Sequence, residues 1–249
     1  MIDDSDSLYD SMFTEPADFR PKSPEPTCHQ ININEKTFQI TLVGNHSLWA
    51  HCVWNAGIVV AKYIESNQIM FKNKSVLEFG AGAMLPSLVS AISGASIVVS
   101  TDYPESSLLD TMQHNAILNV PDQVLNGCLK IEGYLWGSDP ASISAHLPTN
   151  ELFDFIIMAD LIFNHSQHQA LVDSTMKLLS RESISRVLVA FTHHRPWLSE
   201  KDMDFFKVAE NCGFVVDHLF DCDAKEMFEK DAGDLKVRQT VHFYTLRWP

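Results

Sequence analysis

A glycine turn flanked by acidic residues is the segment of this 249-residue chain best suited to chemistry. Val76–Pro86 reads VLEFGAGAMLP, so Gly80 and Gly82 follow a short apolar run. Glycine is needed where a strand-to-helix turn takes positive φ or where backbone approaches a ligand closely. Asp102 follows Gly80 by 22 residues (102 − 80), past the next apolar run, where a carboxylate can accept hydrogen bonds from both ribose hydroxyls. The pattern predicts a nucleoside site.

The residues around the turn restrict the kind of nucleoside. Glu78 directly precedes the turn, where its carboxylate would repel a pyrophosphate. Leu85 occupies the position at which a dinucleotide fingerprint has a third small residue. An adenosyl ligand without phosphates fits both, and the sulfonium and amino groups of S-adenosyl-L-methionine tolerate nearby acids. That molecule is the predicted cofactor, and Glu78 is counted among the residues expected to bind it. The alternatives are an NAD site and a turn that binds nothing.

Histidines and cysteines indicate neither a metal site nor covalent catalysis. His165 and His168, and the pair His193–His194, lack acid or thiol ligands at a diagnostic spacing. His165 is expected to line the cleft beside Asp160 or to be a plain surface residue. The five cysteines form no CxxC pair, which favours reduced thiols, and no Gly-x-Ser-x-Gly elbow occurs.

The elements that position these residues follow from apolar periodicity. Short buried runs predict strands, and apolar residues at helical spacing predict helices. Strands are expected at 76–79, 96–100, 129–133, 153–158, 186–191, 214–219 and 241–246. Helices are expected at 49–64, 85–92, 106–119, 166–179 and 199–212, after a hairpin at 31–42. This alternation predicts an α/β fold with a mainly parallel sheet and helices on both faces.

Composition divides the chain into two parts. Residues 1–27 carry seven acids and four prolines, which predicts a disordered acidic tail, and residues 28–249 are expected to form one domain. The net charge of −14 opposes direct nucleic-acid binding and would attract a basic protein, although it also suits simple solubility. No signal peptide or run of about 20 apolar residues occurs, so a cytoplasmic protein that does not span the membrane is expected.

Further segments resemble a known enzyme family along nearly the whole chain, from Phe13 to the C-terminus. They are 48–57 (LWAHCVWNAG), 76–86, 101–104 (TDYP), 134–137 (YLWG), 159–165 (ADLIFNH) and 193–196 (HHRP). Together they resemble the seven-strand protein N-methyltransferases of the lysine-methylating family. The resemblance implies a Rossmann-like sheet whose last strand is antiparallel. It is strongest to a branch that methylates the N-terminal glycine and adjoining lysine of translation elongation factor 1-alpha, a basic protein partner.

The same resemblance assigns roles to individual positions. The cofactor-binding residues of the family correspond to Trp54, Gly80, Ala81, Gly82, Asp102, Trp136 and Ala159. Its substrate-side motif corresponds to Asp160-Leu-Ile-Phe163, with Asp160 orienting the amine and Phe163 forming the channel wall. Trp54 as a helix-core residue and Asp160 as a helix cap remain alternatives. Three departures from the family pattern are Phe163 in place of Tyr, Met84 in place of Gly and Leu135 in place of Asp.

The expected reaction is direct methyl transfer to a protein amine, without a covalent enzyme intermediate. Two other functions remain open. One is a small-molecule N-methyltransferase acting on a nicotinamide-type acceptor. The other is a catalytically silent cofactor-binding scaffold.

Overall fold

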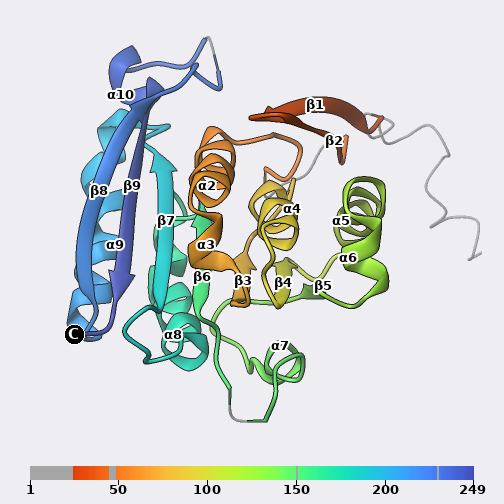
Figure 1. Ribbon diagram of the computed structural model, residues 1–249. Helices are drawn as coiled ribbons and strands as arrows, with labels where there is room; N and C mark the ends of the chain where they lie inside the picture. The colour runs from red at the N-terminus through yellow and green to blue at the C-terminus, as the bar shows by residue number, and fades with distance from the viewer. Residues whose placement is uncertain (1–24, 45–48, 150, 229) are drawn as a thin grey trace, which may run out of the picture.

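The computed structural model describes residues 25–44, 49–149, 151–228 and 230–249, so the predicted tail lies almost wholly outside the described residues. A seven-stranded sheet forms the centre, in the order β5-β4-β3-β6-β7-β9-β8 (Figure 1). Its strands are β3 (Ser75–Phe79), β4 (Ile97–Asp102), β5 (Leu129–Gly133), β6 (Phe155–Ala159), β7 (Arg186–Thr192), β8 (Val215–Asp223) and β9 (Thr240–Arg247). Only β9 runs against its neighbours, which confirms the predicted sheet with an antiparallel last strand.

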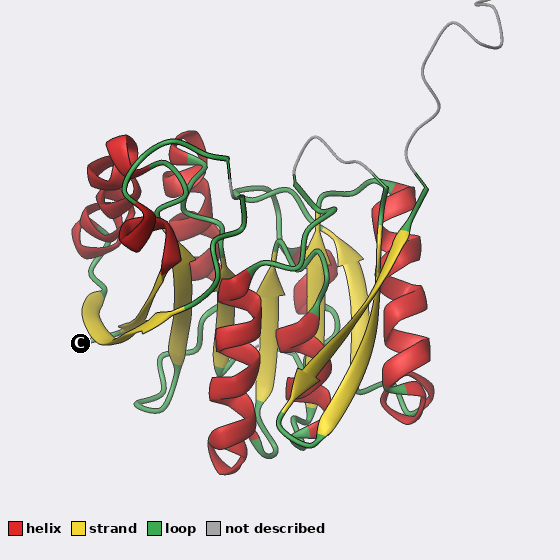
Figure 2. Ribbon diagram, turned by 90° about the horizontal axis from the view of Figure 1, so that it is seen from above, coloured by secondary structure: helices red, strands yellow, loops and turns green. Residues whose placement is uncertain are grey.

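Helices cover both faces of this sheet (Figure 2). The principal helices are α2 (Asn55–Ser66), α4 (Leu85–Ile92), α5 (Ser106–Asn119), α8 (His168–Leu178) and α9 (Ser199–Asn211). The short ones are α3 (Gln68–Phe71), α6 (Pro121–Leu125), α7 (Ala141–Ser144), α10 (Leu235–Gln239), η1 (His165–Gln167) and η2 (Pro196–Leu198). The loops after the carboxyl ends of the parallel strands connect these layers, and all the predicted site residues except Trp54 and Glu78 lie at or just beyond those ends.

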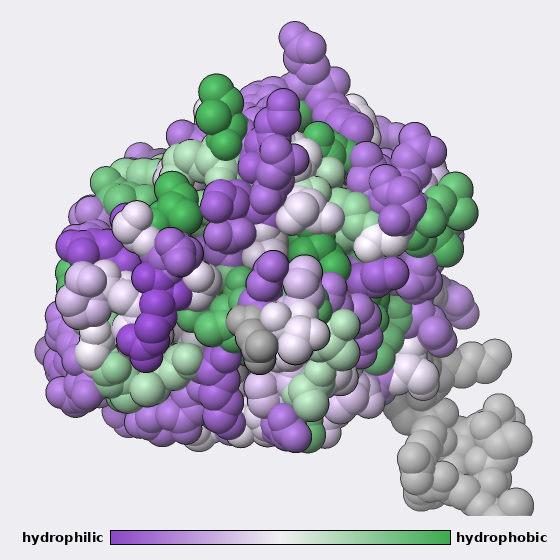
Figure 3. All heavy atoms as spheres, turned by 60° about the horizontal axis from the view of Figure 1, so that its bottom comes forward, coloured by the Kyte–Doolittle hydropathy of each residue, from purple (hydrophilic) through white to green (hydrophobic). Residues whose placement is uncertain are grey.

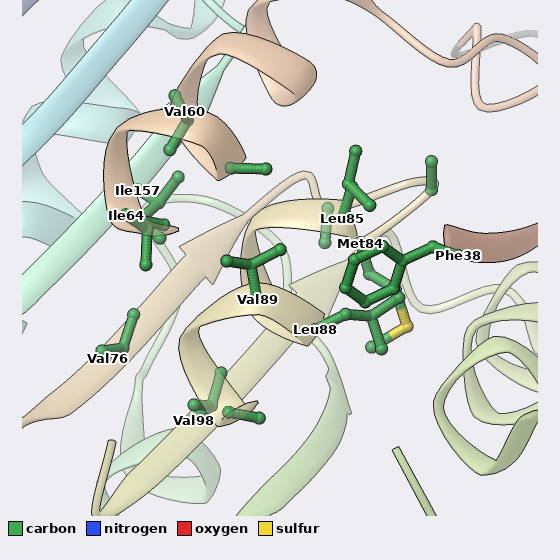
Figure 4. Packing of buried hydrophobic residues seen from close by; sticks show 14 of the residues in the cluster. Phe38, Val60, Ile64, Val76, Met84, Leu85, Leu88, Val89, Val98 and Ile157 are labelled. Carbon is green, nitrogen blue, oxygen red and sulfur yellow. The ribbon is translucent and has the colours of Figure 1, made fainter. Parts of the chain in front are cut away.

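Strand residues alternate between two hydrophobic cores, as the period of two along a strand requires. Val76, Val98 and Ile157 pack with α2 and α4 on one face, as Figure 4 shows, and Leu108 and Met112 of α5 belong to the same core. Leu77 and Val99, the neighbours of Val76 and Val98 along their strands, belong to the second core, with α8 and α9. Both faces of the central strands β3, β4, β6 and β7 are therefore buried, which explains why these strands read as continuous apolar runs.

The hairpin of β1 (Thr27–Ile33) and β2 (Lys36–Leu42) forms a separate two-stranded sheet above α4 and α5 (Figure 1). Phe38 of β2 is 1% exposed and lies beside Met84 and Leu88 (Figure 4). The alternation of apolar residues seen in the sequence thus buries one side of the hairpin against the first core.

The expected helix at 49–64 is wrong at its start. α2 begins at Asn55, and Trp54 is its extended N-cap residue. Trp49 has a φ of 64°, which a helix does not accommodate, and the indole N–H of Trp54 donates to the Trp49 carbonyl at 3.2 Å. The segment before α2 is therefore an ordered loop whose aromatic side chains face the site described below. Among the described residues, no helix combines the length and apolar character needed to cross a bilayer.

Candidate active site

The turn after β3 holds both glycines in the left-handed region, with φ of 55° at Gly80 and 48° at Gly82. A Cβ on Gly80 would lie 2.5 Å from Leu161 Cδ2 and 3.2 Å from Trp136 Cζ2. A Cβ on Gly82 would meet no described atom within 4 Å. A side chain at position 80 would therefore require Leu161 to shift, whereas Gly82 presents bare backbone to open space. Met84, one of the departures from the family pattern noted in the sequence, also has a positive φ, of 50°.

Asp102, the last residue of β4, holds this turn in place. Its Oδ2 accepts a hydrogen bond from the Gly82 N–H at 2.7 Å, and its Oδ1 accepts one from the Tyr103 N–H at 2.7 Å. The residue is 9% exposed. These two bonds fix the orientation of the carboxylate at the end of β4, where it lines the cavity described below.

Glu78 connects the turn to helix α4. Its side chain is buried, and Oε2 accepts hydrogen bonds from the Ser87 N–H, at 2.9 Å, and from the Ser87 hydroxyl. The first of these hydrogen bonds satisfies one of the backbone N–H groups that a helix leaves unpaired in its first turn. Burial raises the pKa of Glu78 to about 8, although the hydrogen bonds from Ser87 oppose that rise. The carboxyl group is therefore mostly protonated at neutral pH.

One cavity of about 510 Å³ is lined by all ten residues that the sequence predicted for the site. They are Trp54, Glu78, Gly80, Ala81, Gly82, Asp102, Trp136, Ala159, Asp160 and Phe163. Tyr103 and Trp49 also line it, and sequence reasoning did not single them out. Both lie inside segments that carry the family resemblance, so a signal for them was present. The structure brings the residues together, and their individual roles remain predictions.

Asp160 follows β6 directly and has a φ of 58°. Its Oδ1 accepts from the Thr192 N–H at 3.1 Å and contacts Nε2 of His194 at 3.1 Å. Its Oδ2 is buried and has no hydrogen-bond partner among the described residues. The helix-cap alternative is wrong, because neither η1 nor α8 has a side-chain cap. Burial alone would lower the pKa of His194, but the Asp160 carboxylate outweighs that effect and the pKa is raised.

A second cavity, of about 250 Å³, adjoins the first and shares four lining residues with it, including Asp160 and Phe163. Its lining residues are Trp49, Trp54, Asp160, Phe163, His194, Arg195, Phe228 and Asp231. Phe228 and Asp231 come from the connection between β8 and α10, where the sequence has no recognisable motif. Asp160 thus stands between a larger and a smaller cavity, with one carboxylate oxygen unpaired.

His165, His168 and His193 contact groups other than Asp160. Nε2 of His165 and Nδ1 of His193 contact the two oxygens of Asp202 at 2.6 and 2.7 Å. The expectation that His165 lines the cleft is therefore wrong, because it lines neither of the two cavities. Nε2 of His168 lies 2.7 Å from the carbonyl of Ile162.

Comparison with known sequences decides the family. The family profile described as lysine methyltransferase matches residues 32–212. The chain belongs to this family. Two relatives are named protein N-terminal and lysine N-methyltransferase efm7. The one from Schizosaccharomyces pombe is 42% identical, and the alignment covers 96% of this chain and 95% of the relative. The one from Neurospora crassa is 40% identical, with 98% and 90% covered.

Solved structures of proteins named as methyltransferases have the same fold as this lysine methyltransferase. A protein from Streptococcus mutans named as a SAM-dependent methyltransferase aligns with a TM-score of 0.60 and 13% identity. The alignment covers 91% of this chain and 56% of that longer one. A second structure, named as a methyltransferase complexed with SAH, aligns with a TM-score of 0.59 and 12% identity, covering 91% and 57%. The protein is an S-adenosylmethionine-dependent methyltransferase of the Rossmann-like type.

The cavity of this methyltransferase suits that cofactor on three structural grounds. Gly82 leaves open space where a side chain would otherwise stand, so a ligand can lie against its backbone. Asp102 places a carboxylate at the same turn, a group that accepts hydrogen bonds from hydroxyls such as those of a ribose. Trp136 lines the same cavity, with its Cζ2 next to Gly80, so the site contains an aromatic side chain of the kind that stacks on bases.

Proposed function

We propose that this enzyme methylates the N-terminal α-amino group and the adjoining lysine of translation elongation factor 1-alpha, in the cytoplasm. The unpaired carboxylate oxygen of Asp160, buried between the two cavities, carries the proposal. A buried acceptor without a partner costs free energy unless a ligand donates to it. An amine that enters the smaller cavity supplies that donor.

The assignment of residues follows from the two cavities. The larger one would hold the cofactor. Asp102 would accept from the ribose, Trp136 would cover the base, and Gly80–Gly82 and Ala159, which also line this cavity, would contact the cofactor through their backbone. S-adenosylmethionine supplies a methyl group on a sulfonium, and S-adenosylhomocysteine is the product that leaves. Asp160 orients the attacking amine, while Thr192 and His194 fix its other oxygen. Phe163 and Trp54, which line both cavities, exclude water between them.

A protein amine fits the smaller cavity better than nicotinamide does. Its two carboxylates, Asp160 and Asp231, suit a group that arrives protonated. An α-amino group has a pKa of roughly 7.7–8.0, against about 10.4 for lysine, so a useful neutral fraction exists at physiological pH. The printed names of the relatives specify N-terminal and lysine methylation. The elongation factor itself is inferred from the family resemblance of the sequence and from the charge of −14, which favours a basic partner.

The test is intact-protein and peptide mass spectrometry after incubation of enzyme and cofactor with unmethylated elongation factor 1-alpha. Methyl groups on the N-terminal peptide are expected. Asp160→Asn should lower kcat by roughly 100-fold or more, with unchanged cofactor affinity. Asp110→Asn, an exposed acid on α5, is the matched control. Efficient methylation of nicotinamide beside an unmodified elongation factor would contradict the proposal, as would full activity of Asp160→Asn.

A further inference from the structure

Three aromatic rings meet at the smaller cavity in the arrangement of a box corner. Trp49, Trp54 and Phe228 have ring centroids 5.8–6.4 Å apart in all three pairs. The planes of the three pairs are inclined at 64–69°, so each ring is nearly perpendicular to the other two. All three side chains line the cavity. A group held in the corner would lie within the roughly 6 Å over which an aromatic face attracts a cation.

The charges around this corner favour a cation. Asp160 and Asp231 both line the cavity, and Asp160 keeps one oxygen without a partner among the described residues. Arg195 and His194 also line it. The guanidinium group of Arg195 donates to the carbonyl of Phe163 at 2.7 Å, and Nε2 of His194 is paired with Oδ1 of Asp160 at 3.1 Å. The corner therefore combines aromatic faces with two carboxylates, a set that recognises alkylammonium groups.

Two side chains, one from α2 and one from α10, donate hydrogen bonds to backbone carbonyls of the segment that contains Phe228. The side-chain amide of Asn55, at the start of α2, donates to the carbonyl of Lys225 at 2.6 Å. Arg238 of α10 is 7% exposed and donates from Nη1 to the carbonyl of Phe228 at 2.9 Å. The ring is therefore positioned by α2 and α10, although it lies on an irregular connection.

We infer that Trp49, Trp54 and Phe228 form a cation-binding corner for the acceptor's ammonium group, with Phe228 as a specificity-determining residue. This inference rests on the proposed function, since it assigns the acceptor amine to the smaller cavity. A carboxylate needs an N–H donor, so each added methyl group weakens hydrogen bonding to Asp160. Attraction to an aromatic face needs only the positive charge and remains when every N–H is replaced. The corner thus retains affinity for amines that already carry methyl groups.

The experiment measures binding of small probes to the full-length protein without cofactor. Choline carries a quaternary ammonium, and 3,3-dimethyl-1-butanol is its neutral counterpart of nearly the same shape. Binding is followed by the indole N–H signals in two-dimensional NMR, because the chain has five tryptophans and single Trp→Phe variants assign them. Choline should shift the Trp49 and Trp54 signals and bind at least about tenfold more tightly than the alcohol.

Variants at position 228 separate charge recognition from simple packing. Phe228→Leu keeps an apolar side chain and should weaken choline binding at least fivefold, whereas Phe228→Tyr should retain it. Leu235→Ala, an exposed apolar residue on α10, is the matched control and should leave binding unchanged. Equal binding of choline and the alcohol, or wild-type choline affinity in Phe228→Leu, would overturn the inference. Because the readout is binding alone, either result leaves the mass-spectrometric test of the proposed function independent.

Discussion

At the scale of single residues, the two glycines of the turn differ in the space around them. Gly80 is confined by Leu161 and Trp136, whereas Gly82 faces open space in the cavity. Both have positive φ, which costs a non-glycine residue about 1 kcal/mol or more. The same chemical change at these two positions should therefore separate folding from cofactor binding.

Gly82→Ala is expected to lower the free energy of unfolding by only about 1 kcal/mol, because its methyl group meets no described protein atom. The same methyl group occupies ligand space, so S-adenosylmethionine affinity should fall at least tenfold. Gly80→Ala should lose more stability, since its Cβ overlaps Leu161. Chemical denaturation and titration calorimetry measure the two quantities. Wild-type affinity for S-adenosylmethionine in the Gly82→Ala variant would show that the cofactor does not contact this turn.

Asp102→Ala tests the ribose contact. Losing two hydrogen bonds from hydroxyls to a charged acceptor should weaken S-adenosylmethionine by about 2 kcal/mol or more. The variant also loses the support that Asp102 gives to the Gly82 and Tyr103 N–H groups, so some loss of melting temperature is expected. Asp102→Asn retains one acceptor and should fall between wild type and Asp102→Ala. Unchanged affinity in titration calorimetry would show that the ribose lies elsewhere.

At the scale of elements, each predicted strand and principal helix forms, because apolar periodicity reports burial and burial is what the sheet provides. Most of the site residues were assigned by the family resemblance. Glu78, Gly80, Gly82 and Asp102 were predictable from the turn pattern itself, since the ends of neighbouring parallel strands converge. Phe228 and Asp231 were not, because they lie in a connection whose course depends on contacts from Asn55 and Arg238. Such long-range contacts leave no local pattern in the sequence.

The buried Glu78 side chain, which is hydrogen-bonded to the start of α4, makes the stability of the fold depend on pH. Its folded pKa of about 8 lies above the ordinary value of 4.5, so the folded state binds a proton that the unfolded state releases. Between these values the unfolded state holds fewer protons, and stability falls as pH rises. Glu78→Gln lacks this titration. The free energy of unfolding of the variant, relative to wild type, should rise between about pH 4.5 and 8 and stay flat outside. If urea denaturation gave the same difference in the free energy of unfolding between variant and wild type across that pH range, the raised pKa of Glu78 would be wrong.

The hairpin is fastened to α5 by two asparagines rather than by the main sheet. The side chain of Asn115 accepts from the N–H of Thr41 and donates to its carbonyl, both at 2.8 Å. Asn119, one turn later, makes the same pair of bonds with Gln39. These side chains satisfy backbone groups that an edge strand would otherwise expose.

Asn115→Ala should lower the free energy of unfolding by about 1–3 kcal/mol, because Asn115 is fully buried and its loss leaves the N–H of Thr41 unpaired. Asn119→Ala, at a more exposed position, should cost less, since water can replace the lost bonds. Urea denaturation of the two variants compares them directly. An equal cost at both positions would show that burial does not set the strength of this attachment.

At the scale of the whole molecule, the excess of acids is the dominant long-range feature. The chain has 32 acidic and 18 basic side chains, and hydrophilic residues cover much of the surface drawn in Figure 3. Such a field accelerates encounter with a basic partner and is screened by salt. The acidic segment at residues 1–27 lies almost wholly outside the described residues, and its role in substrate capture remains a proposal.

Deleting residues 1–26 should raise KM for the proposed substrate, elongation factor 1-alpha. It should leave the melting temperature nearly unchanged, because the segment has few apolar residues to add to a core. The same deletion should reduce the salt dependence of kcat/KM. Raising the ionic strength from about 0.1 M to 1 M shortens the screening length from roughly 10 Å to 3 Å, so wild-type kcat/KM should fall steeply. A short, uncharged acceptor peptide is the control, since it feels little of the protein's field and should show the same kcat/KM with both proteins. If the deletion lowered the melting temperature by many degrees, the segment would belong to the folded domain, and its acids would act through structure rather than through long-range attraction.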